Sequence, residues 1–425
     1  MPVSRRALEI AAALIAAALL GFMLWRLAGL QGMTLANGQP LFGDFIAFWS
    51  AGRATLDGNI EQIHDRHFLY GVQQAIAPGV AFVAPWNSPP PFLFVACVLA
   101  LMPYPVAAVA FFAATLALFL WAMRGLLPDA RALIFPASAP VTIYQAGTVQ
   151  AGLLIAGVSG LALAWLDKRP RLAGAMVALL AIKPHLAVLW PLMLALSGRW
   201  RVFWAAALAT TAFVAAAGLV FGFDAYGRFL DNLAASQDLI SAQRITTPAY
   251  ASLYANLLSL GAPQALALGA HVVSAAGALV MFGWICLQRS VFPDARSAVR
   301  NPGPNTEAFA LGSGFAAGAA PRNDGEVRAE RGLHSAALCA ATLLMSPYLF
   351  FYDFTLLLLG AAMLGAPRDR FELAAAVLAW GAGLSVAVGY VVMLPICPAA
   401  AWAVLIAALR RRGIAAARPA PAPRT

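Results

Sequence analysis

The chain has 425 residues, of which 62% are hydrophobic and 11% charged, and its formal net charge is +10. Roughly 25% of residues are charged in soluble globular domains, so this composition excludes an ordinary soluble protein. Apolar blocks near spanning length recur along the whole chain, separated by short basic or Pro/Gly stretches. The sequence therefore predicts an all-α, polytopic integral membrane protein. Its basic loops follow the positive-inside rule and do not indicate nucleic-acid binding.

The first apolar block, residues 8–30, follows two arginines and is too long for the core of a cleaved signal peptide. We interpret it as a retained first span with a cytoplasmic N-terminus. Residues 31–104 then form a long first extracytoplasmic loop. Within it, residues 44–56 and 61–76 are predicted to be amphipathic helices on the membrane surface. Residues 92–102 are apolar but too short to span comfortably, which favours a juxtamembrane segment.

Apolar segments alternate with basic patches through the rest of the chain, giving about ten predicted spans. Before the C-terminal pair they are residues 106–123, 132–146, 151–166, 202–220, 265–287, 335–345 and 349–364. Residues 172–198 are too short for two full spans, which need about 40 residues. We expect a re-entrant hairpin there, or two short tilted helices, with Lys183 at the tip.

Three less apolar stretches interrupt or end this pattern. Residues 223–249 are predicted to be a polar external loop, and residues 288–332 a flexible cytoplasmic loop. The spans belong to one domain covering residues 1–410, and residues 411–425 are predicted to be a disordered basic Pro/Ala tail.

Asp44 is the first candidate for chemistry because it lies where the chain leaves the first span. It stands beside Phe45, Phe48 and Trp49, at the predicted boundary between lipid and water. A helix cap is the structural alternative for an acid in this place.

Lys183 is the second candidate, since an ionisable group at membrane depth is costly and no acid stands near it in the sequence. Pro184 breaks the helix and leaves backbone amides beside the cation, with the imidazole of His185 next to them. These groups favour a site for an anionic oxygen or phosphate. A snorkelling lysine with a capping histidine is the alternative.

A third cluster joins Tyr348, Tyr352 and Asp353 at a predicted helix end, with the two tyrosines four residues apart on one helix face. It is a candidate lining for a sugar or headgroup pocket, or else an interfacial aromatic belt with a cap. Gln150, like Gln145, flanks an external turn and is a candidate sugar contact or ordinary turn polarity. Arg244 in the polar loop is a candidate phosphate contact or plain loop solvation.

Metal and nucleotide chemistry find little support in the sequence. His64, Asp65 and His67 lack a convincing ligand spacing, and there is no nucleotide-binding loop, so neither a metal nor a cofactor is expected. An activated substrate at the outer face should then be carried by a lipid.

Short motifs follow one another in a recognisable order between about residues 40 and 365. They are Gly43-Asp44-Phe45 with Phe48-Trp49, Leu56-Asp57-Gly58, Ile63-His64-Asp65, Trp86-Asn87-Ser88-Pro89-Pro90-Pro91-Phe92, Leu101-Met102-Pro103-Tyr104, Asp167-Lys168-Arg169-Pro170, Leu172-Ala173-Gly174, Lys183-Pro184-His185, Gly198-Arg199-Trp200-Arg201, and Ser346-Pro347-Tyr348 with Tyr352-Asp353. In this series the chain resembles glycosyltransferase family 87. One element departs from the family pattern, because Gly147-Thr148-Val149-Gln150 replaces a short Gly-Gln or Gly-His-Asn turn.

The resemblance implies a GT-C-type helical bundle and an inverting sugar transfer on the extracytoplasmic side of a bacterial inner membrane. The described member of the family is a polyprenyl-phosphate-mannose-dependent mannosyltransferase. Asp44 matches the general base of the family. The resemblance also implies a polyprenyl-phosphate sugar donor and a glycolipid or glycan acceptor, and membrane lipids are expected as further partners. On physical grounds Lys183 and His185 would steady the leaving phosphate. Trp86 and Asn87 are candidate substrate contacts in one of the shared motifs.

Two other functions are compatible with such a chain. A transporter or flippase of a lipid-linked or small polar solute should show paired broken helices in matching halves. The polar residues are instead predicted on one side, which favours the enzyme. A non-catalytic assembly subunit is the third possibility.

Overall fold

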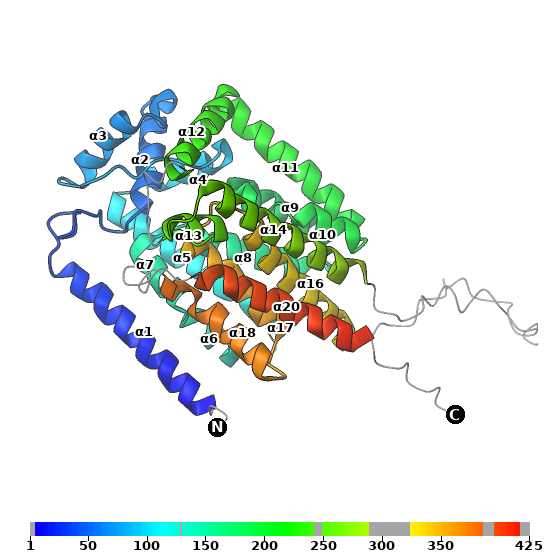
Figure 1. Cartoon of the computed structure of the whole chain (residues 1–425). Coiled ribbons are helices and arrows are strands. Elements are labelled where there is room, and N and C mark those ends of the chain that lie inside the picture. Colours follow the sequence, from blue (N-terminus) through cyan, green and yellow to red (C-terminus); the bar gives the residue numbers. More distant parts are fainter. Residues whose placement is uncertain (1–4, 128–129, 242–248, 289–323, 386–394, 417–425) are drawn as a thin grey trace, which may run out of the picture.

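The computed structural model describes residues 5–127, 130–241, 249–288, 324–385 and 395–416. Within these ranges every regular element is a helix, apart from three isolated β-bridges (Figure 1). The predicted all-α fold is confirmed.

Four of the described helices are long and apolar enough to cross a membrane. They are α1 (Arg5–Leu27), α5 (Tyr104–Leu126), α11 (Trp200–Phe221) and α14 (Gln264–Leu287). Five shorter apolar helical segments accompany them, at Pro90–Ala100, Gly152–Trp165, Pro170–Ile182, Pro184–Leu196 and Phe351–Leu364. Helix α1 stands apart at the edge of the bundle (Figure 1), and most of its large apolar side chains are exposed. The total of about ten spans stays a prediction.

The predicted first loop contains more buried structure than a surface segment would. Its elements are α2 (Phe45–Leu56), η1 (Ile60–Gln62), α3 (Arg66–Ile76), η2 (Pro90–Phe92) and α4 (Leu93–Ala100). Helix α2 is not the surface helix we predicted, because Phe45, Ile46 and Ala51 are fully buried. It packs closely on α4, where an added Cβ at Gly52 would collide with the carbonyl of Ala96.

Prolines divide the next predicted span. Residues 132–146 fall into η3 (Ala130–Leu133), α6 (Ile134–Ala137) and α7 (Pro140–Thr148) because Pro140 starts a new helix at its first turn. Helix α8 (Gly152–Trp165) follows and packs along α5, where a Cβ on Gly157 would lie 3.0 Å from the Phe119 nitrogen.

The segment around Lys183 agrees with the prediction of two short helical pieces. These are α9 (Pro170–Leu179) with η4 (Leu180–Ile182), and η5 (Pro184–Leu186) with α10 (Trp190–Leu196). Lys183 stands between them with φ −146° and ψ 70°, because a residue before proline is pushed out of the helical region. Its place at the break between the two pieces is confirmed.

Two predicted loops are partly helical, which corrects the sequence interpretation. Helix α12 (Asp224–Ser241) occupies most of the predicted polar loop. Ala225 and Ser236 are buried on one face of it, and Asn232 between them donates to the Trp86 carbonyl at 3.1 Å. The polar surface of α12 hid this helical spacing. Helix α16 (Asp324–Met345) begins inside the predicted 288–332 loop. Residues 289–323 and Arg244 lie outside the described residues.

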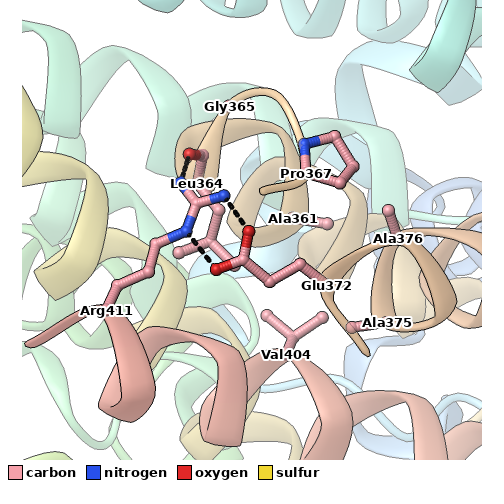
Figure 2. A pocket seen from close by; sticks show the side chains of 9 residues that line it. All are labelled: Ala361, Leu364, Gly365, Pro367, Glu372, Ala375, Ala376, Val404 and Arg411. Carbon is pink, nitrogen blue, oxygen red and sulfur yellow. Dashed lines mark hydrogen bonds and ion pairs between the residues drawn. The ribbon is translucent and has the colours of Figure 1, made fainter. Parts of the chain in front are cut away.

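The C-terminal part closes the bundle. Its elements are α13 (Leu253–Ser259), η6 (Phe351–Phe354), α17 (Thr355–Leu364), α18 (Arg370–Gly381), η7 (Ala382–Leu384) and α20 (Ile396–Ala416). Helix α20 includes residues 411–416 of the predicted tail. Arg411 of this helix is buried, and its guanidinium donates to both carboxylate oxygens of Glu372, at 2.8 and 2.6 Å, and to the Leu364 carbonyl (Figure 2).

A short backbone bridge joins two segments about a hundred residues apart. Tyr250 pairs with Phe350 in an antiparallel bridge. The Ala251 nitrogen donates to Leu349 at 2.8 Å, and the Phe351 nitrogen donates to Ala249 at 2.9 Å. This bridge holds the segment before α13 against the turn that carries Tyr352 and Asp353.

Candidate functional site

Asp44 stands at the N-cap position of α2 without capping it. Its side chain makes no hydrogen bond to the first turn of the helix. Its Oδ2 instead accepts a hydrogen bond from Gln150 Nε2 at 2.9 Å. The cap alternative for Asp44 is therefore wrong. The carboxylate is directed toward the turn before α8. This turn contains Gly147-Thr148-Val149-Gln150, the element that departs from the family pattern, and Gln150 supplies a contact from it.

Two left-handed turns place this pair. Phe42 (φ 65°) and Val149 (φ 42°) are the non-glycine residues with positive φ in the described part of the chain. Each stands within two residues of Asp44 or Gln150. Gly43, also left-handed, lies against the other turn, since an added Cβ would be 3.2 Å from the Thr148 Cα. Such backbone costs about 1–2 kcal/mol at a residue with a Cβ, so the surrounding packing must maintain it.

The electrostatics around Asp44 act in opposite directions. The residue is half-buried, and removal of water from its carboxylate raises its pKa above the usual value. The hydrogen bond from Gln150 and the positive charge of Lys183 oppose this rise. Lys183 therefore lies within electrostatic range of Asp44, as expected if the two share one site.

Lys183 has an acid partner that its own sequence neighbourhood does not reveal. Its ammonium forms an ion pair with Asp353 and lies 4.7 Å from the centre of the Tyr352 ring. Tyr352 in turn stacks on Phe350, with ring centres 5.3 Å apart. Asp353 also accepts from the Phe350 backbone nitrogen at 3.1 Å, so it acts as a cap as well as a counterion. The structure thus joins three candidates, Lys183, Tyr352 and Asp353, in one cluster.

The start of α8 connects this cluster to Asp44. A Cβ on Gly152 would collide with the carbonyl oxygen of Tyr352. The buried Gln145 donates to Thr355 Oγ1 at 2.6 Å and accepts from the Leu153 nitrogen at 3.1 Å. Gln145 is therefore used inside the protein, which argues against a sugar contact for it. Gln150 stands two residues before Gly152, so the start of α8 contacts both Asp44 and the turn that carries Asp353.

Other candidates have different surroundings. Tyr348 is not on a helix with Tyr352, which corrects the shared-face argument, because residues 346–350 are not helical. Its ring packs against Tyr254 at 5.8 Å. Trp86 is 1% exposed and stacks on Phe92 at 5.6 Å, so its ring has no surface for a ligand.

Asn87 and His185 complete the set. The Asn87 Oδ1 accepts from Asn232 Nδ2 at 2.8 Å, which ties the first loop to α12. His185 follows Pro184, and its buried Nε2 has no hydrogen-bond partner among the described residues.

Tyr250 is a residue of the site that sequence reasoning missed. Its ring lies 4.9 Å from that of Phe350, across the backbone bridge. Burial raises the pKa of its phenol to about 12, with smaller contributions from Asp44 and Tyr348 and an opposing one from Arg66. Nothing in its local sequence marks it, because its position depends on pairing with a distant segment.

A family model described as glycosyltransferase family 87 matches residues 86–300. This range is half of the chain and contains Gln150, Lys183 and His185, while Asp44 and Asp353 lie outside it. Comparisons with curated proteins and with solved structures found no match.

Proposed function

Because the chain belongs to glycosyltransferase family 87, and is accordingly a membrane glycosyltransferase, we propose the following reaction. A sugar moves from a polyprenyl-phosphate donor to a hydroxyl acceptor, with inversion at the anomeric carbon and Asp44 as general base. The observation that carries this proposal is the Asp44–Gln150 hydrogen bond at 2.9 Å, within electrostatic range of Lys183.

The proposed step needs a single carboxylate as base. Gln150 holds Oδ2 of Asp44, which leaves Oδ1 to accept the proton of the acceptor hydroxyl. The hydroxyl oxygen forms a bond to the anomeric carbon while the bond from that carbon to the phosphate oxygen breaks. Polyprenyl phosphate leaves with the electron pair. The raised pKa of Asp44 makes it a stronger base than an exposed aspartate.

Lys183 is proposed to stabilise the departing phosphate. An ammonium has three N–H donors, and Asp353 uses one, so two remain for phosphate oxygens. Asp353 fixes the direction of the lysine, and Tyr352 limits its movement from the other side. The unpartnered Nε2 of His185 is a further donor for the same group when it carries the ring proton.

The remaining assignments concern the sugar and the membrane. We assign Tyr352, with Tyr348 and Asn87 as further candidate contacts, to the sugar end of the donor. Asp353, 1% exposed, acts there through Lys183, and Trp86 is a buried support within the first loop. A mannose-like hexose or a pentose, a glycolipid or glycan acceptor, and a site facing the periplasm of a bacterial inner membrane complete the proposal. A lipid carrier suits a site at a membrane boundary because no soluble nucleotide sugar is needed there.

Reconstituted protein tests the proposal. Vesicles receive labelled polyprenyl-phosphate sugars and a panel of acceptors, and product formation is compared among wild type, Asp44→Asn and Asp57→Asn. Asp57 is a matched control because it is an exposed acid of the same loop, paired with Arg53 on the surface. We expect Asp44→Asn to lower kcat by about 10²–10⁴-fold, the usual contribution of a general base, and Asp57→Asn to behave as wild type.

Three outcomes of this experiment would contradict different parts of the proposal. Wild-type rates in Asp44→Asn would reject Asp44 as the base while leaving the donor class intact. Transfer from a nucleotide sugar, with none from any lipid-linked sugar, would reject the donor. Movement of the lipid-linked sugar across the vesicle membrane without any product would favour the transporter.

A further inference from the structure

A second charged cluster lies at the opposite end of α8 from Asp44. Gln150 precedes this helix and Asp167 follows it, and its 14 residues separate the two by about 21 Å. The Asp167 carboxylate bridges two arginines, Arg199 at 3.2 Å and Arg331 at 3.4 Å. Arg412 lies beside them on α20, with its Nη2 3.9 Å from Glu330.

These arginines are incompletely satisfied. Arg199 Nε, Arg331 Nε and Arg412 Nη2 are buried, and none of the three has a hydrogen-bond partner in the described part of the chain. Buried donors without partners are rare and cost about 1–3 kcal/mol each, more when the group is charged. Arg411, the neighbour of Arg412, shows the contrast, because its guanidinium donates to Glu372 and to the Leu364 carbonyl (Figure 2) and also to the Ala366 carbonyl.

The charges of the cluster do not balance. Among the residues that the structure describes, Arg199, Arg331 and Arg412 pair with two carboxylates, Asp167 and Glu330, so the cluster has one positive charge more than it has negative ones. A phosphodiester carries one negative charge, and its oxygens match the planar fork of a guanidinium. The cluster therefore fits an anion of this kind in its charge and in the kind of donor that it offers.

The cluster is formed where several helices end on one side of the bundle. Arg199 precedes α11, Arg331 lies in the first half of α16, and Arg412 lies near the end of α20 (Figure 1). The side chains of Arg199 and Arg331 are 18% and 19% exposed, so a ligand can reach part of each guanidinium and extend from there to the buried donors, while Arg412 is 5% exposed. Basic pockets between membrane helices are recurrent sites for lipid headgroups.

We propose that Arg199, Arg331 and Arg412 bind a phosphate oxyanion, that of a phospholipid headgroup in the leaflet opposite the proposed catalytic site. The oxygens would accept from the guanidinium groups that now lack partners. The bound lipid would join α11, α16 and α20 at this end of the bundle. The site is independent of the sugar transfer, since it uses none of the groups around Asp44.

Lipid binding to the purified, delipidated protein tests the inference by thermal melting and native mass spectrometry. The additions are phosphatidylglycerol, the same diacylglycerol without its phosphate, and inorganic phosphate. The variants are Arg331→Gln and Arg410→Gln. Arg410 is the matched control because it lies on α20 and carries the same charge, but it pairs with Asp369 on the surface. If Arg331→Gln does not fold, Arg199→Lys replaces it, since lysine keeps the charge and loses the fork.

We expect phosphatidylglycerol, and not diacylglycerol, to raise the melting temperature of wild type and of Arg410→Gln. In Arg331→Gln the affinity should fall about 10- to 100-fold, the factor for one lost charged hydrogen bond, and the lipid adduct should disappear from the mass spectrum. Stabilisation by phospholipid alone supports the headgroup, and equal stabilisation by inorganic phosphate assigns a free anion to the same site. Equal effects of the two lipids, or undiminished binding in Arg331→Gln, would overturn the proposal.

Discussion

Lys183 and Asp353 form an ion pair although they lie 170 residues apart in the sequence. Their side chains are 18% and 1% exposed, and the lysine also contacts the Tyr352 ring. Each charge has been removed from water and depends on the other for compensation. The pair therefore belongs to the fold as much as to the proposed site.

Replacing one partner of this pair should destabilise the protein. Lys183→Met leaves the Asp353 carboxylate buried without its cation, and the expected loss is about 3–5 kcal/mol. The double variant Lys183→Met/Asp353→Leu should recover much of that loss because it leaves no unpaired charge. A double-mutant cycle on unfolding in one detergent measures the coupling. Strictly additive effects of the two substitutions would argue against the pairing.

Activity should fall on the acid side of neutrality. Only the ionised Asp44 can accept a proton, and burial raises its pKa, so the loss begins at a higher pH than for an exposed aspartate. The stability contribution has the opposite sign: the folded state favours protonated Asp44, so stability from this group decreases as pH rises through that pKa. A profile of kcat/KM from pH 4 to 9 measures the first effect. A flat profile down to pH 4 is the result that contradicts it.

Gln150 is expected to position Asp44. In Gln150→Leu the Asp44 carboxylate loses its hydrogen-bond donor. A hydrogen bond to a charged group contributes about 1.5–3 kcal/mol, and the loss of that amount from the transition state would lower kcat by about 10- to 150-fold. The hydrogen bond also lowers the pKa of Asp44, so its loss should shift the acid limb of the pH profile upward. A purely structural role would lower activity without moving that limb. Gln62→Leu, at an exposed position of the first loop, should leave both the activity and the acid limb unchanged.

Gly152→Ala should push the turn that carries Tyr352 and Asp353 away from the start of α8, where Gln150 holds Asp44. The new Cβ would collide with the Tyr352 backbone, which cannot yield as a flexible side chain would. We expect a loss of about 1–3 kcal/mol from overpacking, together with reduced activity. Gly269→Ala in α14 is the control, since nothing lies within 4 Å of its Cβ. Wild-type melting and activity in Gly152→Ala would contradict the close contact.

The membrane helices were the part of the fold most open to prediction. Helices α5, α8, α11 and α14 lie within a few residues of their predicted bounds because long apolar runs have few other structures available to them. Helix α12 is not predicted from the sequence because its composition is polar, although Ala225, Asn232 and Ser236 lie on one face of it against the protein. The polar composition of α12 indicates a loop, and it conceals the helical spacing of the residues that face the protein.

The site was predictable as a set of residues and not as a set of contacts. Asp44 and Lys183 are predicted as ionisable groups at membrane depth or at its boundary, Asp353 as part of a polar-aromatic cluster at a helix end, and Gln150 as a polar residue beside an external turn. Their pairing depends on long-range packing, which one sequence does not encode in a readable form. The left-handed backbone at Val149 was equally hidden, since a β-branched residue is among the least expected there.

The bridge between Tyr250 and Phe350 has a consequence for how this molecule can evolve. Its bonds join backbone atoms only, at Ala249, Ala251, Leu349 and Phe351, so they do not depend on side-chain identity. Ala251, Leu349 and Phe351 are almost fully buried, so packing restricts their side chains, whereas Ala249 and Phe350 are half-buried and can change while the backbone beside Lys183 and Asp353 keeps its position. Under the proposed function, substitutions at Ala249 and Phe350 are therefore expected to change the preference for a sugar or an acceptor at a smaller cost in stability than substitutions at the buried positions.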